Sequence, residues 1–289
     1  MLLKRHIVLY LLPLVGIVTV FLLVPLTFSM FLSLHEWNGL SSMSYVGLDN
    51  FKRLLDDPVF TVSIKNTLLW IGAAAFLHIP LGLLLALVLS KKPPGWRFFR
   101  TAFFLPNVIS STALALLWYF TFHVNIGLLN SFLKEVGLGS LARPWLNDPK
   151  LAVFVTMVPF VLYVGVTMVI FLMQITAIPQ EIYEAAEIDG ATGWQKDWSI
   201  TIPLLRGGIA VNVIFNVTAC LKMFEYPWLM TGGGPARSSM NVSLYIYQEM
   251  MTANRYGVSM AAGLLTIAFG VLVIVSSLYT MRWAEGRGK

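Results

Sequence analysis

The chain has 289 residues, of which 57% are hydrophobic and 12% are charged, and its formal net charge is +6 at pH 7. Soluble domains contain about 45–50% apolar and about 25% charged residues, so the composition excludes an ordinary soluble fold. No basic stripe with interleaved aromatic residues is present, which argues against nucleic-acid binding. The single cysteine, Cys220, excludes an internal disulfide and is expected to be a packing residue.

Six long apolar stretches are predicted to cross a membrane, since about 20 apolar residues span its hydrocarbon core. The first is too long for the core of a signal peptide, and no small-residue cleavage site follows it. Pro13 and Pro25 are expected to kink the first span, and Pro106 with Asn107 to break the third. The expected fold class is an all-α membrane protein with spans at residues 7–34, 62–90, 101–122, 151–175, 204–228 and 256–283.

The connections between the spans also carry predictions. Residues 35–61 form a polar connection, in which Tyr45–Phe51 is expected to make a turn before a short amphipathic helix. Another helix is expected within residues 238–254. The predicted domains are residues 1–61, the first transmembrane helix with its periplasmic connection, and residues 62–289, a core domain of five transmembrane helices.

Charge distribution predicts the orientation in the membrane. Residues 91–100 contain four bases and no acid, and short Lys/Arg-rich loops remain in the cytoplasm. Six spans place both termini on one side. With the termini inside, and with a base near the end of a span counted with the adjoining segment, cytoplasmic segments hold eleven Lys/Arg residues and outer segments eight. A multi-pass protein of the cell (inner) membrane with both termini in the cytoplasm is therefore predicted.

Residues 179–203, between the fourth and fifth spans, are the most polar run in the chain, with five acids and one base. Pro179 suits a first helical position, and Gly190 can end that helix in a left-handed conformation. Trp194, Trp198 and Ile202 recur four apart, so a second short helix is expected, ended before Pro203. Such an amphipathic elbow could lie on lipid headgroups, but helices at membrane surfaces are usually rich in Lys and Arg.

The elbow resembles the EAA signature of ABC importer permeases. The resemblance rests on Glu184-Ala185-Ala186, on Gly190 four positions later, and on Ile200 and Pro203, whereas Ile202 departs from the Leu that the signature prefers. It implies a type I ABC importer permease fold in which residues 176–205 form a cytoplasmic coupling helix that docks in a cleft of an ATPase subunit. The coupling residues that it implies are Glu184, Ala185, Ala186, Asp189 and Gly190.

A second resemblance concerns the substrate class. Residues 222–225, 231–235 and 244–247 resemble the segment between the fifth and sixth spans of carbohydrate permeases related to the maltose transporter, and residues 45–51 resemble a run after their first span. The partners implied are a second homologous permease, two ATPase subunits, and a periplasmic or lipid-anchored solute-binding protein that delivers sugar. ATP and Mg would be bound by the ATPase, not by this chain. Glycerol-phosphate importers share the pattern, so a polyol-like solute remains an alternative.

The chain itself is not expected to be an enzyme. It lacks the G-x-x-x-x-G-K-[ST] run that cradles nucleotide phosphates, a G-x-S-x-G nucleophile elbow, and any His/Cys set with metal-ligand spacing. No metal or cofactor site is therefore predicted, and His78 in the second span is expected to be a hydrogen-bonded packing residue. An ion-coupled secondary transporter, the distant alternative, often shows two similar halves, and no internal repeat is evident.

Polar side chains at membrane depth form the candidate substrate path, because such groups usually face a bundle interior or a wet pathway. Lys222 and Glu225 are three apart and are expected to pair on one helical face. Asn216 and Tyr163 complete the set, and an aromatic ring with amide and charged groups suits a polyhydroxylated ligand. Two alternatives stay open: Lys222 snorkels to the outer interface, or Asn212 and Asn216 join neighbouring helices.

Overall fold

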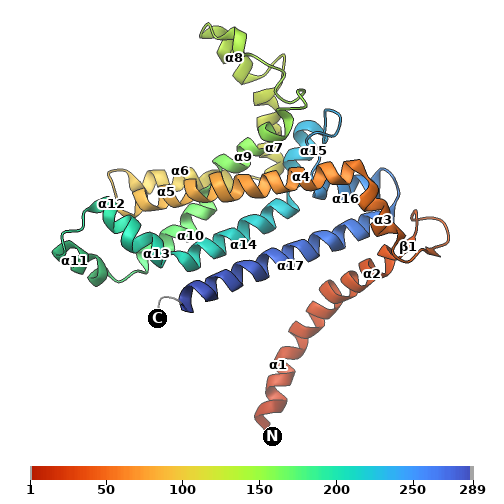
Figure 1. The fold of residues 1–289 in the computed structure, drawn as a ribbon, viewed down its shortest axis with the longest axis horizontal. Helices are drawn as coiled ribbons and strands as arrows, with labels where there is room; N and C mark the ends of the chain where they lie inside the picture. The colour runs from red at the N-terminus through yellow and green to blue at the C-terminus, as the bar shows by residue number, and fades with distance from the viewer. Residues whose placement is uncertain (1, 287–289) are drawn as a thin grey trace. The chain divides into compact units, whose positions relative to one another are not determined.

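The computed structural model describes residues 2–286, with side-chain surroundings described for residues 10–279. The chain divides into two compact units. Unit 1 comprises residues 1–61 and 245–268, and unit 2 comprises residues 62–244 and 269–289. Both units are helical, and the long helix α17 (Tyr256–Gly286) contributes to each (Figure 1).

Unit 1 begins with a long apolar helix and continues into a small polar cap. Buried Asn50 donates hydrogen bonds to the carbonyls of Ser33 and His35, which fixes α3 at the end of α2. The short amphipathic helix predicted after residues 45–51 is confirmed as α3, although Tyr45 lies in a strand instead of a turn. The elements before α4 are α1 (Leu2–Val18), η1 (Thr19–Leu23), α2 (Val24–Ser33), antiparallel strands β1 (His35–Glu36) and β2 (Ser44–Tyr45), and α3 (Asp49–Asp56).

Unit 2 holds most of the helices. The helix predicted within residues 238–254 is confirmed as α16, whereas α8 lies in a stretch for which no helix was predicted. From α4 to α16 the elements in chain order are α4 (Pro58–Ala73), η2 (Ala74–His78), α5 (Ile79–Ser90), α6 (Trp96–Phe104), η3 (Leu105–Val108), α7 (Ser111–Phe122), α8 (Leu128–Glu135), η4 (Gly139–Leu141), α9 (Ala152–Leu162), α10 (Gly165–Thr176), α11 (Gln180–Ile188), α12 (Gly193–Lys196), η5 (Asp197–Thr201), α13 (Ile202–Leu204), α14 (Arg206–Lys222), α15 (Glu225–Thr231) and α16 (Val242–Met251). Residues 58–61 of α4 and 245–251 of α16 belong to unit 1.

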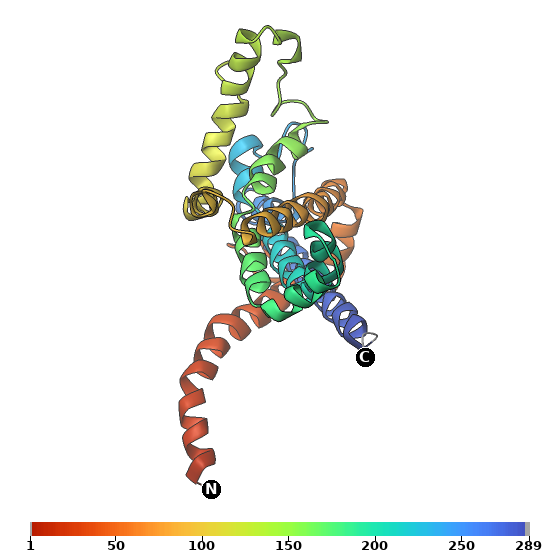
Figure 2. The ribbon, with the colours of Figure 1, turned by 90° about the vertical axis from the view of Figure 1, so that its left-hand side faces the viewer.

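Five helical stretches in the described part of the chain are long and apolar enough to cross a membrane. A sixth is added if the pair Trp96–Val108 and Ser111–Phe122, bent by 98°, is one broken span. The bend is visible in Figure 2, where α7 rises toward α8 at the top of the view. Helix α6 gives way to the 3-10 turn η3 at Pro106 and Asn107, as the sequence predicts, and the bend itself follows at Ile109 and Ser110, which are extended. The five stretches are Tyr10–Ser33, Pro58–Ser90, Ala152–Thr176, Arg206–Thr231 and Tyr256–Tyr279.

Three prolines are accommodated by π-helical turns within otherwise continuous helices. Each of Pro25, Pro80 and Pro203 follows a five-residue π-helix by two positions, so the residue four places before the proline is the centre of that turn. A proline lacks an N–H and its ring clashes with the carbonyl four residues earlier. The wider π-turn removes both problems, so these prolines do not end their helices.

The predicted fifth span is not one continuous helix, which corrects the sequence interpretation. Helix α14 ends at Lys222, Met223 is extended, and α15 starts at Glu225. Pro227 lies four residues after Met223, so an unbroken helix would force its ring against the Met223 carbonyl. Buried Asn241 donates a hydrogen bond to that carbonyl, which satisfies it at the break.

Small residues allow the helices of unit 2 to pack closely. A Cβ atom at Gly82 in α5 would lie 2.5 Å from the Thr167 side chain in α10. One at Gly208 in α14 would overlap Gln174 in α10. Glycine at such contacts lets helix backbones approach closely, as is common in membrane bundles. Helix α10 thus lies against both α5 and α14, and its C-terminal end leads directly into the acidic elbow.

A buried chain of polar groups links η2, α9, α10 and α14. The His78 Nδ1 atom donates to the Phe160 carbonyl (2.8 Å), and Nε2 lies 3.0 Å from the Thr167 hydroxyl. The same hydroxyl accepts a hydrogen bond from the Asn216 amide at 3.1 Å. His78 is therefore a hydrogen-bonded packing residue, as the sequence predicts.

Candidate functional site

The acidic elbow begins with α11, which carries the EAA-like residues, and Gly190 ends this helix. Gly190 has a φ of +82°, its N–H donates to the Glu187 carbonyl (3.0 Å), and the next N–H, of Ala191, donates to the Ala186 carbonyl (2.8 Å). These two bonds form a Schellman motif, which requires a left-handed residue at the Gly190 position. The predicted glycine elbow is confirmed, and Pro179 is the residue before the helix instead of its first residue.

The second half of the elbow is longer than predicted. Thr192 and Gln195 form a capping box at the start of α12, where they satisfy backbone N–H groups. The helix then continues through the π-turn η5 into α13, so it does not end before Pro203. The predicted end before Pro203 was wrong because the π-turn η5 removes the clash between the proline ring and the carbonyl four residues earlier.

Two side-chain contacts fasten the halves of the elbow together. Lys196 Nζ lies 2.5 Å from Glu187 Oε1, and the Tyr183 hydroxyl lies 3.0 Å from the Thr201 hydroxyl. Both contacts join α11 to the segment after Gly190. The elbow therefore contains links beyond its backbone hinge, which favour movement of its two halves together.

A third contact ties the elbow to the end of α5. Lys91 Nζ lies 2.5 Å from Asp197 Oδ2, and the same ammonium lies 5.8 Å from the centre of the Trp194 ring. The Asp197 side chain is only 9% exposed, whereas the Lys91 side chain is 51% exposed. The sequence analysis used Lys91 for topology alone. Its contacts with the acid Asp197 and the Trp194 ring could not be predicted from the sequence, because Lys91 and Asp197 are 106 positions apart.

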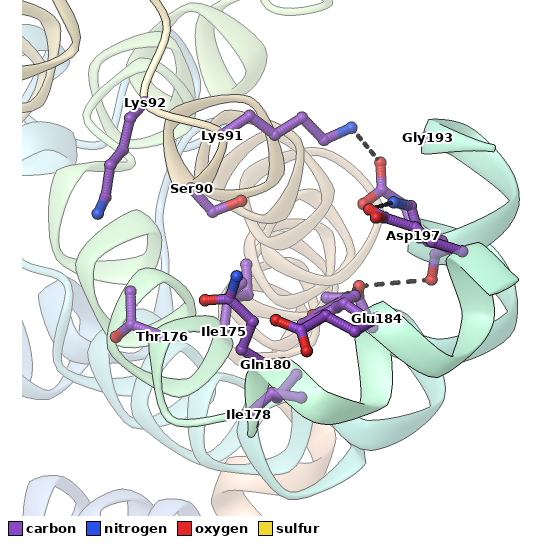
Figure 3. A pocket seen from close by; sticks show the side chains of 14 residues that line it. Ser90, Lys91, Lys92, Ile175, Thr176, Ile178, Gln180, Glu184, Gly193 and Asp197 are labelled. Atoms are coloured by element: carbon purple, nitrogen blue, oxygen red, sulfur yellow. Dashed lines mark hydrogen bonds and ion pairs between the residues drawn. The ribbon is translucent and has the colours of Figure 1, made fainter. Parts of the chain in front are cut away.

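A pocket of about 620 Å³ lies between the elbow and the ends of α5 and α10 (Figure 3). Glu184 and Gln180 point toward this space from α11, and Lys91 reaches over it to Asp197. The lining is mixed in charge and mostly polar. It consists of Ser90, Lys91, Lys92, Ile175, Thr176, Ile178, Gln180, Tyr183, Glu184, Glu187, Gly193, Lys196, Asp197 and Thr201.

The outer surface of the elbow is both acidic and apolar. Glu184, Ala185, Asp189 and Gly190 are exposed, and Ala186 is half-buried. Large apolar side chains lie exposed beside them, with exposed fractions of 87% for Ile188, 64% for Trp194 and 65% for Trp198. Acids interleaved with exposed aromatic residues suit a protein partner with a basic or mixed surface. The structure thus brings all five predicted coupling residues to one exposed helix and its cap.

The structure separates Lys222 from Glu225. Because the helix breaks between them, they do not share one helical face, and no ion pair joins them in the described part of the chain. The expectation of pairing was therefore wrong, and its cause is the break imposed by Pro227. Lys222 is exposed at the last position of α14, and Glu225 is partly buried at the first position of α15.

The other two candidate path residues have defined partners. Asn216 is 1% exposed and donates hydrogen bonds to Thr167 in α10 and to the Asn212 carbonyl. This matches the alternative in which Asn216 joins neighbouring helices. Tyr163 lies at the break between α9 and α10, and its hydroxyl accepts a hydrogen bond from Trp118 Nε1 at 2.7 Å.

A second pocket, of about 410 Å³, lies within unit 1. Arg53 pairs with Glu36 at 3.1 Å, and Arg255 pairs with buried Glu249 at 2.6 Å. The hydrogen bond from Arg53 and its positive charge lower the pKa of the Glu36 carboxyl. The side chain of Trp37 lies against Tyr256, with ring centres 5.1 Å apart. The pocket therefore combines an aromatic wall with charged groups that already have partners.

Comparisons with known proteins agree with this architecture. The chain is 36% identical to the probable ABC transporter permease protein YurN of Bacillus subtilis (strain 168), with 91% of this chain and 89% of that protein covered. It is 34% identical to the multiple sugar-binding transport system permease protein MsmF of Streptococcus mutans serotype c, with coverages of 90% and 88%.

A solved structure is also similar over nearly the whole chain. It is a chain of a bacterial alginate ABC transporter, crystallised in complex with a periplasmic protein bound to an alginate pentasaccharide. The TM-score is 0.84 at 26% identity, with 96% of this chain and 95% of that chain covered. In addition, residues 78–284 match the family model described as the binding-protein-dependent transport system inner membrane component. The chain therefore belongs to the family of inner-membrane permease components of binding-protein-dependent ABC transporters, with the type I importer permease fold.

Proposed function

We propose that this chain is the permease subunit of an ATP-driven importer that moves a sugar or oligosaccharide into the cytoplasm. A solute-binding protein outside the membrane delivers the substrate. A second homologous permease completes the pathway, and two ATPase subunits hydrolyse ATP with bound Mg. Residues 62–289 form the core permease domain in this proposal, and residues 1–61 add the first transmembrane helix and its periplasmic connection.

The observation that carries the proposal is the exposed elbow that follows α10. Gly190 holds its Schellman cap, and Glu184 and Asp189 lie exposed next to Ile188. A helix that only rested on lipid headgroups would gain from basic residues, whereas this surface is acidic. The elbow is also fastened to α5 by the Lys91–Asp197 pair, which supports transmission of force from a docked ATPase into the helix bundle. Coupling is assigned to Glu184, Ala185, Ala186, Asp189 and Gly190.

The proposed orientation places the elbow and both termini in the cytoplasm. The bases of residues 91–100 support it, since such loops remain inside. Lys91 from this basic loop contacts Asp197 of the elbow, which supports a location of the two segments on the same side of the membrane. The positive loop and the coupling surface thus support one orientation.

The substrate class is supported by the relatives. MsmF is named for multiple-sugar transport, and the similar solved structure is named for alginate, a polysaccharide. These names favour a saccharide over glycerol phosphate, and membership of the family argues against an ion-coupled secondary transporter. Lys222, Glu225 and Tyr163 are the proposed substrate-path residues. Asn216 acts on the path through the helix contact that it makes with Thr167.

The test is uptake by the complete transporter, reconstituted in liposomes with its solute-binding protein and ATPase. Labelled mono- and oligosaccharides and glycerol phosphate are each added on the side of the solute-binding protein. ATP is supplied on the side of the ATPase subunits. We expect uptake of a saccharide that requires ATP hydrolysis and persists when ionophores collapse ion gradients. Uptake that follows an ion gradient without ATP would refute the ATP-driven mechanism, and uptake of glycerol phosphate alone would refute the saccharide assignment.

A further inference from the structure

A small amphipathic pocket of about 160 Å³ lies beside the coupling loop, within unit 2. Three helix ends form it: the C-terminal end of α5, the first turns of α6 and the C-terminal end of α10. Polar and basic groups occupy part of its wall and apolar side chains the remainder. Its lining residues are Leu89, Ser90, Lys92, Trp96, Arg100, Leu172, Met173 and Thr176.

Two cations converge on this pocket without a carboxylate. Lys92 and Arg100 line it, and neither forms an ion pair with any described acid. Residues 91–100 contain no acid, and the neighbouring base, Lys91, is already paired with Asp197. Two unpaired cations at one pocket favour an anionic ligand, and a phosphate with several acceptor oxygens suits an ammonium and a guanidinium together.

The apolar part of the wall indicates the source of that phosphate. Met173 is 60% exposed next to the pocket, and Phe98 and Phe99 on α6 are 71% and 47% exposed. Met173 belongs to the predicted fourth span, and Phe98 and Phe99 belong to the stretch Trp96–Val108, the first half of the bent pair that can form the sixth crossing. Lipid acyl chains would cover apolar side chains at such positions. Trp96, which also lines the pocket, is a residue type enriched at the membrane–water interface.

We infer that this pocket binds the headgroup of one anionic phospholipid from the cytoplasmic leaflet, with its phosphate between Lys92 and Arg100 and its acyl chains along Met173. The volume suits a headgroup, whereas the chains lie on the open apolar surface. Basic pockets between transmembrane helices on the cytoplasmic side are suited to such headgroups. The inference rests on the cytoplasmic placement of residues 91–100 in the proposed function.

A lipid bound in this small pocket would also affect the larger pocket under the elbow. Ser90, Lys92 and Thr176 line both this pocket and the larger pocket beneath the elbow. A phosphate held by Lys92 would therefore lie next to the surface at which Glu184 faces α5 and α10. The bound lipid stabilises the ends of these helices in the conformation that holds the elbow.

The chain offers a matched control on the same helix. Arg97 and Arg100 both lie on α6, and replacing either with alanine removes one positive charge. Arg100 lines the pocket, whereas Arg97 does not and stacks near the Trp96 ring at 5.6 Å. A comparison of R100A with R97A therefore separates a defined site from general attraction between basic residues and an anionic membrane.

The experiment is native mass spectrometry of the purified complete transporter, titrated with phosphatidylglycerol or with phosphatidylcholine of the same acyl chains. We expect one phosphatidylglycerol to bind more tightly than any phosphatidylcholine. Its Kd should rise about fivefold for each charge lost in K92A or R100A, and about 25-fold in the double variant, from the interaction typical of one basic residue near anionic lipid. The Kd of R97A should stay within about twofold of the wild-type value. R100K should retain binding because it keeps the positive charge, and this result would separate loss of the site from misfolding.

Three results would overturn the inference. The first is equal binding of the two lipids. The second is an equal loss in R97A and R100A, which would indicate diffuse attraction. The third is displacement of the lipid by inorganic phosphate alone at matching concentration, which would indicate a site for a free anion. Because the readout is bound lipid, it is independent of the saccharide uptake that tests the proposed function.

Discussion

The ammonium of Lys91, at the end of α5, lies 2.5 Å from the carboxylate of Asp197, in the π-turn of the elbow. The Asp197 side chain is almost buried, and Lys91 is its ion-pair partner among the described residues. Helix α5 in turn packs along α10 through Gly82. A displacement of the elbow therefore has a direct route into two of the helices that build the membrane core.

Removing this cation should weaken the attachment of the elbow to α5. We expect Lys91→Ala to cost about 1–2 kcal/mol, less than the about 3–5 kcal/mol of a broken, fully buried pair, because half of the Lys91 side chain is in solvent. In proteoliposomes, the number of ATP molecules hydrolysed per substrate imported should rise. Lys91→Arg should keep the ratio near that of the wild type, and Arg97→Ala controls for loss of charge. A wild-type ratio in Lys91→Ala would show that the pair does not contribute to coupling.

The cap of α11 gives a second prediction. A Cβ atom at Gly190 would meet nothing within 4 Å, so its φ of +82° is the reason for glycine there. Gly190→Val places a β-branched residue in the left-handed region, at a cost of more than about 1–2 kcal/mol. We expect the variant to insert in the membrane but to lose the co-purifying ATPase. Gly190→Asn should retain most of it, because Asn tolerates this conformation. Equal retention in both variants would contradict the role of the cap.

The charge of the coupling surface gives a third prediction. Glu184 is exposed and lines the pocket under the elbow, whereas Glu181 is exposed on the same helix outside the pocket lining. Glu184→Lys should abolish binding of the ATPase and uptake, since a like charge facing a basic partner costs several kcal/mol. Glu181→Lys makes the same change in net charge and should be much milder. Pull-down of the ATPase with the tagged permease measures both, and equal effects would argue against a specific role of Glu184.

The elements that local chemistry controls could be predicted from the sequence. The apolar runs predicted the membrane spans, Pro106 predicted the interruption of the third span, and Gly190 predicted the end of α11. These features depend on residues close together in the chain. The consequences of Pro203 and Pro227 were harder to predict, because a helix containing proline can widen into a π-turn, as before Pro203, or break, as before Pro227.

The contacts that complete the site could not be predicted, for a different reason. The pairing of Lys91 with Asp197 and the hydrogen bond from Asn216 to Thr167 join separate helices. Their formation depends on how α5, α10 and α14 pack, which small residues such as Gly82 and Gly208 determine in three dimensions. A single sequence shows that these polar groups need partners, but it does not identify them.

The orientation can be tested by cysteine labelling in intact cells. Gly95 is a poor position for the label because its φ is +78°, whereas Pro94 is exposed in the same basic loop. The native Cys220 is 1% exposed, so it should contribute little background. We expect Pro94→Cys to react with a membrane-impermeant maleimide only after the cytoplasmic side is opened. Labelling from outside intact cells would place this loop in the periplasm and overturn the proposed topology.

Lys222 gives the last prediction. It ends α14, about 24 Å along the axis from Arg206 at about 1.5 Å per residue, and it has no described ion-pair partner. Its free ammonium can therefore donate hydrogen bonds to substrate oxygens, each worth about 1.5–3 kcal/mol. Lys222→Ala should lower uptake at low substrate concentration by about tenfold or more, with assembly and basal ATP hydrolysis unchanged.

The structure also predicts how Lys222 and Glu225 combine. Because the helix breaks between them and no ion pair joins them, the effects of Lys222→Ala and Glu225→Ala should add, with a coupling free energy below about 0.5 kcal/mol. A larger coupling would indicate that the two side chains meet during transport. Wild-type uptake of every tested saccharide by Lys222→Ala would favour a lysine that snorkels to the interface. Loss of assembly would instead make it structural, and the substrate contact would then be sought at Tyr163, where the break between α9 and α10 lies.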